Sequence, residues 1–438
     1  MTVSPEKRLE ILDALRRGTV PKNGVEALAV GLDHFARSFE EDLERVGKGG
    51  AVFKAIRGEY GCGKTFLARW LQDRALKRGF AVTEVQVSET ETPLHRLETV
   101  YRRLIERLRT NDVDGGAFRS IVDAWFFALE EDVIGENSEP PSPETLIQKT
   151  NDLIEQRLLA VSKTTPIFAI GLRAYRTALT QNNKAVADGI LAWLGGQPAV
   201  GAEAKRAAGI RGEVDHSAAL GFLQGLLTLL RDSGLPGLLI IIDEVETLQR
   251  VRADVREKAL NALRQLIDEI DAGRFPGLYL VITGTPAFFD GPQGVQRLPP
   301  LAQRLHVDFN TEARFDNPRA VQLRLAAFTK DSLIEVGSRV TQLFAAGSPK
   351  AERILEQANP ALLADLAQAV AGKLGGKVGV APRIYLKKLV GDILDRLEQF
   401  SDFNPRRDYS LTINHAELTT VEQSAAGVAS VDDIALEV

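Results

Sequence analysis

Cysteine is nearly absent from this sequence, and its scarcity excludes two classes of protein. The chain has 438 residues and one cysteine, Cys62, so it has neither an intrachain disulfide framework nor a zinc site built from cysteines. Its five histidines are scattered, and no two have the spacing of metal ligands. Long apolar runs are also missing. Runs such as Leu238–Ile242 are far shorter than the roughly 20 residues that cross a bilayer.

No targeting segment is expected at the N-terminus. Residues 1–17 are charged throughout and lack the apolar core of a signal peptide. We therefore expect a cytoplasmic protein that has no contact with a membrane.

Neither sign of charge dominates. The formal net charge is −5, from 54 lysines and arginines and 59 aspartates and glutamates. This mild acidity argues against DNA binding through net charge alone, but it is compatible with a local basic face. Such clusters are usually solvated surface. The candidates for contact with double-stranded DNA are Arg102, Arg103, Arg107 and Arg109; Lys205, Arg206 and Arg211; and Arg406 and Arg407.

The sequence alternates between strand and helix patterns. Apolar residues make up 44% of the chain, too much for disorder. Strands are expected at 51–57, 81–88, 238–243 and 278–284. A helix with Phe66, Leu67, Trp70 and Leu71 on one stripe is expected after the first strand, and further helices are expected at 94–109 and 253–271. This alternation predicts an α/β fold with a parallel sheet, the three-layer arrangement of P-loop NTPases.

Helical segments flank and interrupt the alternation. After Phe315 the pattern is helical only, at about 317–337, 349–371 and 382–399. We therefore expect N-terminal helices at 1–50, a sheet domain at 51–315 with a helical insertion at about 111–220, a helical lid at 316–400, and a tail at 401–438. The last fifteen residues of this tail should be poorly ordered.

The strongest chemical signal follows the first strand. Residues 58–65 match G-x-x-x-x-G-K-[ST], and with the next residue the segment reads Gly58, Glu59, Tyr60, Gly61, Cys62, Gly63, Lys64, Thr65 and Phe66. Only a glycine-rich turn brings several N–H groups close to phosphate oxygens, and the helix that follows adds positive charge. We expect Lys64 to contact the β and γ phosphates of ATP, and Thr65 to bind Mg²⁺.

Cys62 lies inside this loop and has two interpretations. The simpler one is a small residue at a position that tolerates many types. In the other, nearby N–H groups and Lys64 lower the pKa of the thiol and make it reactive.

A second chemical signal lies at the end of the third strand, where the apolar residues Leu238–Ile242 are followed by Asp243 and Glu244. Ligands of open α/β sheets bind beyond the carboxyl ends of the strands. We expect Asp243 to hold Mg²⁺ through water and Glu244 to act as general base on the attacking water. A solvated acidic turn is the alternative, and the upstream glycine-rich loop makes it the weaker one.

Polar residues after the fourth strand and two arginines complete the candidate site. We expect Thr283, or else Thr285, to sense the γ-phosphate or hold the attacking water. Arg304 would reach a nucleotide on a neighbouring subunit, which implies a homo-oligomer. Arg383 would reach the γ-phosphate from the lid. For any single arginine, the alternative is an ordinary surface charge.

Together these motifs resemble the AAA+ ATPases, especially their initiator branch, and this resemblance implies that Arg383 is the second sensor. The chain more closely resembles the ATP-binding D component, BrxD, of bacterial BREX phage-exclusion systems, over about residues 20–400. That resemblance rests on Arg57–Leu67, Glu84–Ser88, Ala192–Gly196 and Leu239–Leu248. It implies an antiviral role and partners from the same BREX defence system.

These observations predict an Mg²⁺-dependent ATPase that acts on DNA or on defence partners. The alternative is a nucleotide-gated binding module, in which ATP orders the lid, recruits a partner and is hydrolysed slowly. Glu244 favours the ATPase, because a binding module needs no general base. A DNA translocase ranks third, since nothing beyond the nucleotide site resembles helicase motifs.

Overall fold

An open parallel sheet organises the fold. The structure is a computed structural model that describes residues 3–135, 142–210, 213–375, 379, 381–419 and 422–423. Within these ranges five strands pair in the order β2-β3-β4-β1-β5. They are β1 (Val52–Arg57), β2 (Ala81–Gln86), β3 (Leu238–Asp243), β4 (Leu278–Gly284) and β5 (Gln322–Arg324). The predicted α/β class with an all-parallel, P-loop NTPase-like sheet is confirmed.

The apolar sequence of β3 and β4 explains why these two strands are paired inside the sheet. Both are buried along their whole length, as continuous apolar strands of parallel sheets are when both faces are covered. In the register of the sheet, Ile242 lies opposite Ile282, and Gln86 of β2 lies opposite Asp243. The carboxyl ends of these three strands therefore bring polar residues to one edge.

The chain divides into two compact units, each assembled from separate stretches of sequence. The first contains residues 1–38, 56–73 and 307–438, and the second contains residues 39–55 and 74–306. The boundary falls inside β1 and inside two helices, α2 (Asp33–Gly47) and α3 (Lys64–Lys77).

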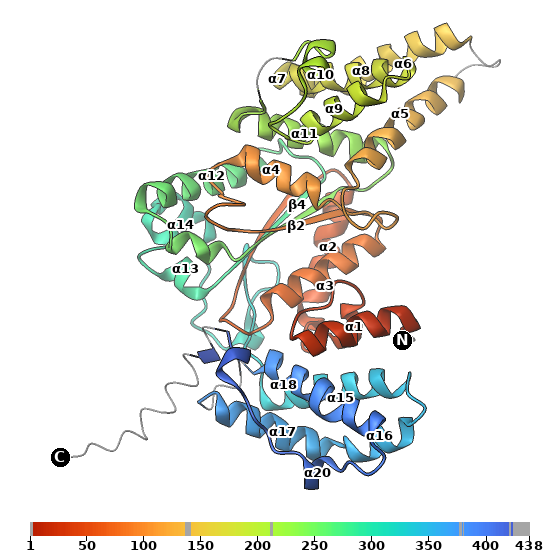
Figure 1. Cartoon of the computed structure of the whole chain (residues 1–438). Coiled ribbons are helices and arrows are strands. Elements are labelled where there is room, and N and C mark those ends of the chain that lie inside the picture. The colour runs from red at the N-terminus through yellow and green to blue at the C-terminus, as the bar shows by residue number, and fades with distance from the viewer. Residues whose placement is uncertain are drawn as a thin grey trace. The chain divides into compact units, whose positions relative to one another are not determined.

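The second unit carries most of the sheet and the helical insertion. Figure 1 shows the insertion helices gathered at one end of this unit, beyond α4. The insertion comprises α5 (Phe118–Gly135), α6 (Pro143–Arg157), α7 (Leu159–Thr164), α8 (Pro166–Thr180), α9 (Lys184–Leu194), α10 (Ala202–Ala207) and α11 (His216–Asp232), so its last helix extends past residue 220. The remaining helices of the unit are α4 (Leu97–Glu106), η2 (Val245–Gln249), α12 (Ala253–Asp271), α13 (Pro286–Asp290), η3 (Val295–Arg297) and α14 (Pro299–Leu305). Across the described ranges, no helix is both long enough and apolar enough to span a bilayer.

An aromatic cluster fixes the insertion to α4. The Phe222 ring lies 5.0 Å from that of Phe168 and 5.3 Å from that of Trp193, centre to centre, both in edge-on contact. Tyr101 of α4 adds a third ring at 5.9 Å, and its hydroxyl donates to the Leu194 carbonyl at 2.9 Å. Edge-on aromatic pairs and a satisfied hydroxyl stabilise such a junction.

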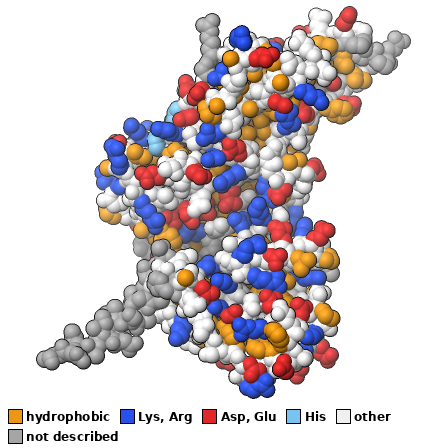
Figure 2. All heavy atoms as spheres, viewed as in Figure 1, with side chains coloured by type: hydrophobic (Ala, Val, Ile, Leu, Met, Phe, Trp, Pro, Cys, Tyr) orange, Lys and Arg blue, Asp and Glu red, His pale blue; other side chains and the backbone are white. Residues whose placement is uncertain are grey.

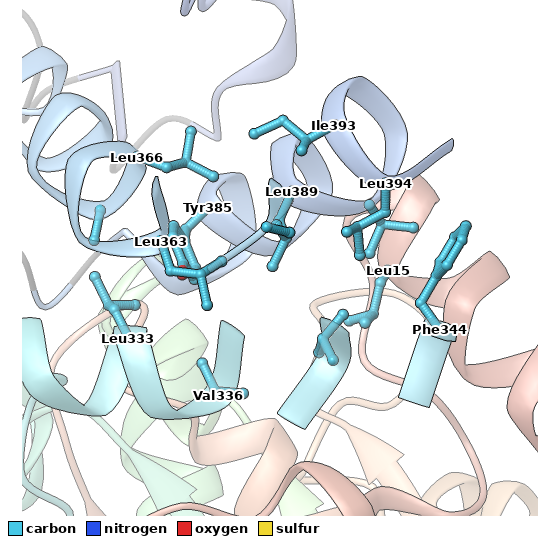
Figure 3. Packing of buried hydrophobic residues seen from close by; sticks show 14 of the residues in the cluster. Leu15, Leu333, Val336, Phe344, Leu363, Leu366, Tyr385, Leu389, Ile393 and Leu394 are labelled. Atoms are coloured by element: carbon cyan, nitrogen blue, oxygen red, sulfur yellow. The ribbon is translucent and has the colours of Figure 1, made fainter. Parts of the chain in front are cut away.

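The first unit contains a helical bundle with one continuous apolar core. Its helices are α15 (Lys330–Ala345), α16 (Ala351–Gln357), α17 (Pro360–Lys373), α18 (Pro382–Lys388), the π-helical η6 (Leu389–Leu394) and α19 (Asp395–Gln399). The N-terminal helix α1 (Pro5–Arg17) and η1 (Val25–Leu28) pack into the same core. Figure 3 shows Leu15 of α1 beside Leu394 and Phe344 of the bundle. Phe66, at the end of the glycine-rich segment, also packs against this core.

A short edge strand lies where the sequence pattern predicts helix. Helix was predicted at 317–337, but residues 322–324 form β5, η4 (Ala313–Phe315) precedes it, and α15 begins at Lys330. The prediction was wrong there because a three-residue strand is too short for a periodic signal. Its pairing is seen where Leu325 N–H donates to the Arg57 carbonyl at 2.8 Å.

The predicted helix at 349–371 is two helices. Pro360 has no N–H to continue α16, and Asn359 instead caps α17 by accepting the N–H of Leu362. After α19 lie α20 (Pro405–Asp408) and η7 (His415–Glu417). The last fifteen residues and Arg211 lie outside the described residues.

Candidate functional site

The glycine-rich loop joins β1 to α3 and has the backbone of a phosphate-binding turn. Gly61 and Gly63 have φ angles of 80° and 96°, a left-handed region that suits glycine. Gly58 is required for close packing, because a Cβ there would lie 2.5 Å from the Cys62 sulfur. The Leu67 N–H donates to the Gly63 carbonyl at 2.8 Å and opens the helix. The loop therefore leads directly into the positive end of α3, as in anion-binding sites.

Lys64, the first residue of α3, is buried and folds back over the loop. Its ammonium donates to the carbonyl oxygens of Gly58 and Glu59, at 2.9 and 3.2 Å, and lies 5.1 Å from the centre of the Tyr60 ring. Thr65 follows in the first turn with a half-buried side chain. A fixed positive charge beside loop N–H groups suits polyphosphate oxygens.

Cys62 packs inside the loop, with 2% of its surface exposed. Burial raises the pKa of its thiol to about 11, and the positive charge of Lys64 offsets only part of that rise. The thiol is therefore protonated at neutral pH. Of the two interpretations from sequence, this geometry favours the small packing residue.

The acidic end of β3 forms a hydrogen-bonded group with β4, entirely within the second unit. Asp243 and Thr283 are almost completely buried, and the Thr283 hydroxyl donates to Asp243 Oδ1. The Glu244 N–H donates to the same oxygen at 3.0 Å and to Thr283 Oγ1 at 3.3 Å. Thr285 is also buried, just beyond the strand. The structure thus brings together Asp243, Glu244 and the first-choice threonine.

Glu244 has an unusual backbone conformation, and its carboxylate is bound by a residue that sequence reasoning missed. Its φ angle is 58°, one of two positive values among the non-glycine residues that the structure describes. Gln86 Nε2 donates to Glu244 Oε2 at 2.6 Å. Gln86 ends β2, whereas the strand was predicted over 81–88, so the prediction placed Gln86 inside the strand and not at its carboxyl end.

Both predicted arginines are paired inside their own units. Arg304 of α14 forms an ion pair with Asp268 of α12, with 2.5 Å between NH2 and Oδ1. Arg383 of α18 donates from Nε to Glu422 Oε1 at 3.0 Å, and from NH2 to Glu422 Oε2 and the Glu417 carbonyl. Neither is an isolated surface charge.

The basic clusters considered for DNA contact are interspersed with acidic groups. Arg103 pairs with Glu106 at 2.8 Å, and Arg109 pairs with Asp114 at 2.5 Å. Figure 2 shows basic and acidic side chains mixed over the visible face of each unit. Such pairing weakens the positive potential that a cluster presents to DNA phosphates.

The comparisons with known proteins give one match. The sequence model of the BREX system ATP-binding protein family BrxC/D matches residues 3–413. A search of curated proteins finds no match. The matched range includes the glycine-rich loop, the acidic strand end and Arg383, and it ends before Glu417 and Glu422.

Proposed function

Since the chain belongs to the BREX system ATP-binding protein family BrxC/D, we propose that it hydrolyses the ATP it binds. Family membership gives the chain an ATP-binding role in BREX defence. Hydrolysis is the further step, and its support comes from the residues at the acidic strand end.

We assign the phosphates of ATP to the loop and helix start, residues 58–66. The left-handed glycines Gly61 and Gly63 let backbone N–H groups approach an anion, and Lys64 adds a localised charge. Thr65 and Asp243 are the side chains that would hold Mg²⁺. A hydroxyl and a carboxylate suit this ion, which prefers oxygen ligands and keeps several waters. When bound, the ion neutralises charge on the phosphate oxygens.

Glu244 is assigned as the general base that accepts a proton from the attacking water. The observation that carries the proposal is how this side chain is held: Gln86 donates to its carboxylate at 2.6 Å, and its own N–H donates to Asp243. Left-handed backbone at a residue with a Cβ is typical of functional sites. Thr283 would position the Asp243 carboxylate through its hydroxyl.

Arg383 and Arg304 extend the proposal to the lid and to the assembly of subunits. Arg383 would read the γ-phosphate from the lid, and Arg304 would act on a nucleotide of a neighbouring subunit in a homo-oligomer. Double-stranded DNA and other BREX proteins are the partners we propose, and the cytoplasm is the proposed location.

The alternative remains a nucleotide-gated binding or scaffold module with little turnover. One observation favours it: the insertion exposes large apolar side chains, with Phe127 63% and Leu159 55% exposed. Exposed large apolar side chains are a common feature of protein–protein contact surfaces.

Phosphate release by wild type and Glu244→Gln, with and without double-stranded DNA, separates the two functions. Loss of the general base should slow turnover by about 100-fold or more, while ATP binding is retained. Glu257→Gln, at an exposed position of α12, is the matched control and should behave as wild type. Equal turnover in wild type and Glu244→Gln would instead favour the binding module.

A further inference from the structure

The chain beyond the lid folds back onto the lid. The Tyr409 hydroxyl donates to Asp392 Oδ2 of η6 at 3.2 Å. Arg353 of α16 donates to the Phe400 carbonyl at 3.0 Å and to the Phe403 carbonyl at 2.6 Å. Apolar side chains of the same segment pack against the lid core: Phe403, Tyr409, Leu411, Ile413 and Leu418. The described part of this C-terminal segment, residues 400–419 and 422–423, is therefore packed against the lid.

Two acidic residues of the segment bind the basic face of α18, and we call this pair the acidic clasp: Glu417 and Glu422. Glu417 accepts from Lys388 at 3.0 Å and from Lys387 at 3.2 Å. Glu422 accepts from Arg383. The two carboxylates of the clasp thus pair with three cations of α18.

Burial makes the Glu422 contact more than a surface ion pair. The Glu422 side chain is 5% exposed and that of Arg383 is 29% exposed. Thr419 also donates to Glu422, from N–H at 2.7 Å and from its hydroxyl at 2.9 Å. A buried carboxylate that loses its cation is strongly destabilised, so Glu422 stays docked only while Arg383 faces it.

The clasp occupies the part of Arg383 that would bind phosphate. Glu422 takes the Nε and NH2 donors together, in the two-bond geometry that guanidinium groups form equally with carboxylates and phosphates. NH2 also donates to the Glu417 carbonyl. An arginine engaged in this way cannot use the same donors for a phosphate oxygen.

We propose that the acidic clasp is an autoinhibitory contact, in which Glu422 competes with the γ-phosphate of ATP for Arg383. The inference rests on the proposed role of Arg383 as a γ-phosphate reader. Engagement of ATP by the lid then requires the clasp to open and the end of the C-terminal segment to leave α18. The clasp residues follow residue 413, so this control goes beyond the part of the chain that matches the family.

Calorimetric titration of ATP and of ADP into the full chain and three variants tests the clasp. Glu422→Gln removes the charge but keeps the side-chain size, so ATP affinity should rise about three- to tenfold with little change for ADP. Asp402→Asn removes the same charge from an exposed site in the same segment, and it should leave both affinities unchanged. Arg383→Ala should weaken ATP binding relative to ADP.

The outcomes distinguish failure of the clasp from failure of the proposed function. Suppose that Arg383→Ala loses the preference for ATP over ADP while Glu422→Gln binds both nucleotides like wild type. The autoinhibitory role of the clasp is then wrong, and the γ-phosphate role of Arg383 stands. If Arg383→Ala keeps that preference, the γ-phosphate role is wrong, and competition for Arg383 is wrong with it.

Hydrogen exchange gives a second readout that does not depend on turnover. In the Glu244→Gln background, which should hydrolyse ATP slowly, adding ATP should speed amide exchange in residues 409–419 to the level seen in Glu422→Gln. Glu417→Gln should speed exchange without nucleotide, because it removes the second half of the clasp. Exchange in this segment that is the same with and without ATP would overturn the proposal.

Discussion

Glu244 shows how the fold stabilises a strained residue at the proposed reaction centre. A left-handed backbone at a residue with a Cβ costs of order 1–3 kcal/mol. At Glu244, where φ is 58°, this strain is offset by hydrogen bonds to Asp243 and Thr283 and by the bond from Gln86. The backbone angle turns the residue out of the β3 direction while its carboxylate stays fixed. This arrangement is consistent with a base that must be ready before substrate arrives.

Lys64→Ala tests the phosphate loop at the same scale. Its ammonium donates to the loop carbonyls of Gly58 and Glu59. Loss of this localised charge should weaken ATP binding about 10- to 100-fold. Titration calorimetry measures the affinity. Lys77→Ala, at the exposed far end of the same helix, is the matched control. Unchanged affinity in Lys64→Ala would count against the loop assignment.

At the scale of elements, the charge of the Glu417 carboxylate helps to hold the C-terminal segment on α18. Burial of the Glu417 carboxylate disfavours its charged form, but hydrogen bonds from Lys388, the Asn414 N–H and Lys387 prevail and lower its pKa to about 2. A carboxylate whose pKa is lower in the folded than in the unfolded state stabilises the folded state at pH values above its unfolded-state pKa. That stabilisation is lost as the pH falls towards its folded-state pKa. Charged and titratable groups near Glu417 include Lys387, Lys388 and, through Lys388, Asp392. Tyr409 and Arg383 also lie close to this residue.

The C-terminal segment should therefore undock in acid before the lid unfolds. As pH falls from the ordinary carboxyl value of 4.5 towards 2, protonation of Glu417 should release it from α18. Pulsed hydrogen exchange, corrected for the intrinsic rate at each pH, should show protection of residues 409–419 falling while α17 stays protected. Glu417→Gln should remove most of this pH dependence. Equal loss of protection in α17 would mean global unfolding and contradict the prediction.

At the scale of the whole molecule, the proposed chemistry is spread over both compact units. The phosphate loop and Arg383 belong to the first unit, and Asp243, Glu244 and Arg304 belong to the second. Each unit is assembled from separate sequence stretches, so neither corresponds to a contiguous piece of the chain. On the proposed assignments, turnover would require the full chain, and also its assembly if Arg304 acts between subunits.

Arg304→Ala should lower turnover only in the assembled protein, by about 10³-fold, as for other arginines supplied between subunits. Within one chain the guanidinium pairs with Asp268, so the isolated subunit gains nothing from it at its own site. Phosphate release over a range of protein concentrations, with mass measured in parallel, tests this. Asp268→Asn removes the partner, keeps Arg304 and should retain activity. A monomer that hydrolyses ATP equally well before and after Arg304→Ala, with the assembly also unaffected, would disprove the assignment.

The local pattern of apolar residues in the sequence predicted the first and last residues of several elements. The continuous apolar runs of β3 and β4 and the periodicity of α12 were predicted with the bounds that the structure has, 238–243, 278–284 and 253–271. The glycine-rich loop was equally clear, because a strand, a glycine turn and a helix are adjacent in sequence. Such signals need no information from distant parts of the chain.

Only the tertiary structure decided what pairs across long separations. The Gln86–Glu244 bond joins residues 158 positions apart, and the Arg383–Glu422 pair depends on the C-terminal segment folding back over α18. Strand β5 and the packing of α1 into the lid core likewise arise from contacts with remote residues. Sequence periodicity reports which face of an element is apolar, whereas strand register and helix packing select its partner, because that choice depends on burial and charge summed over the whole fold.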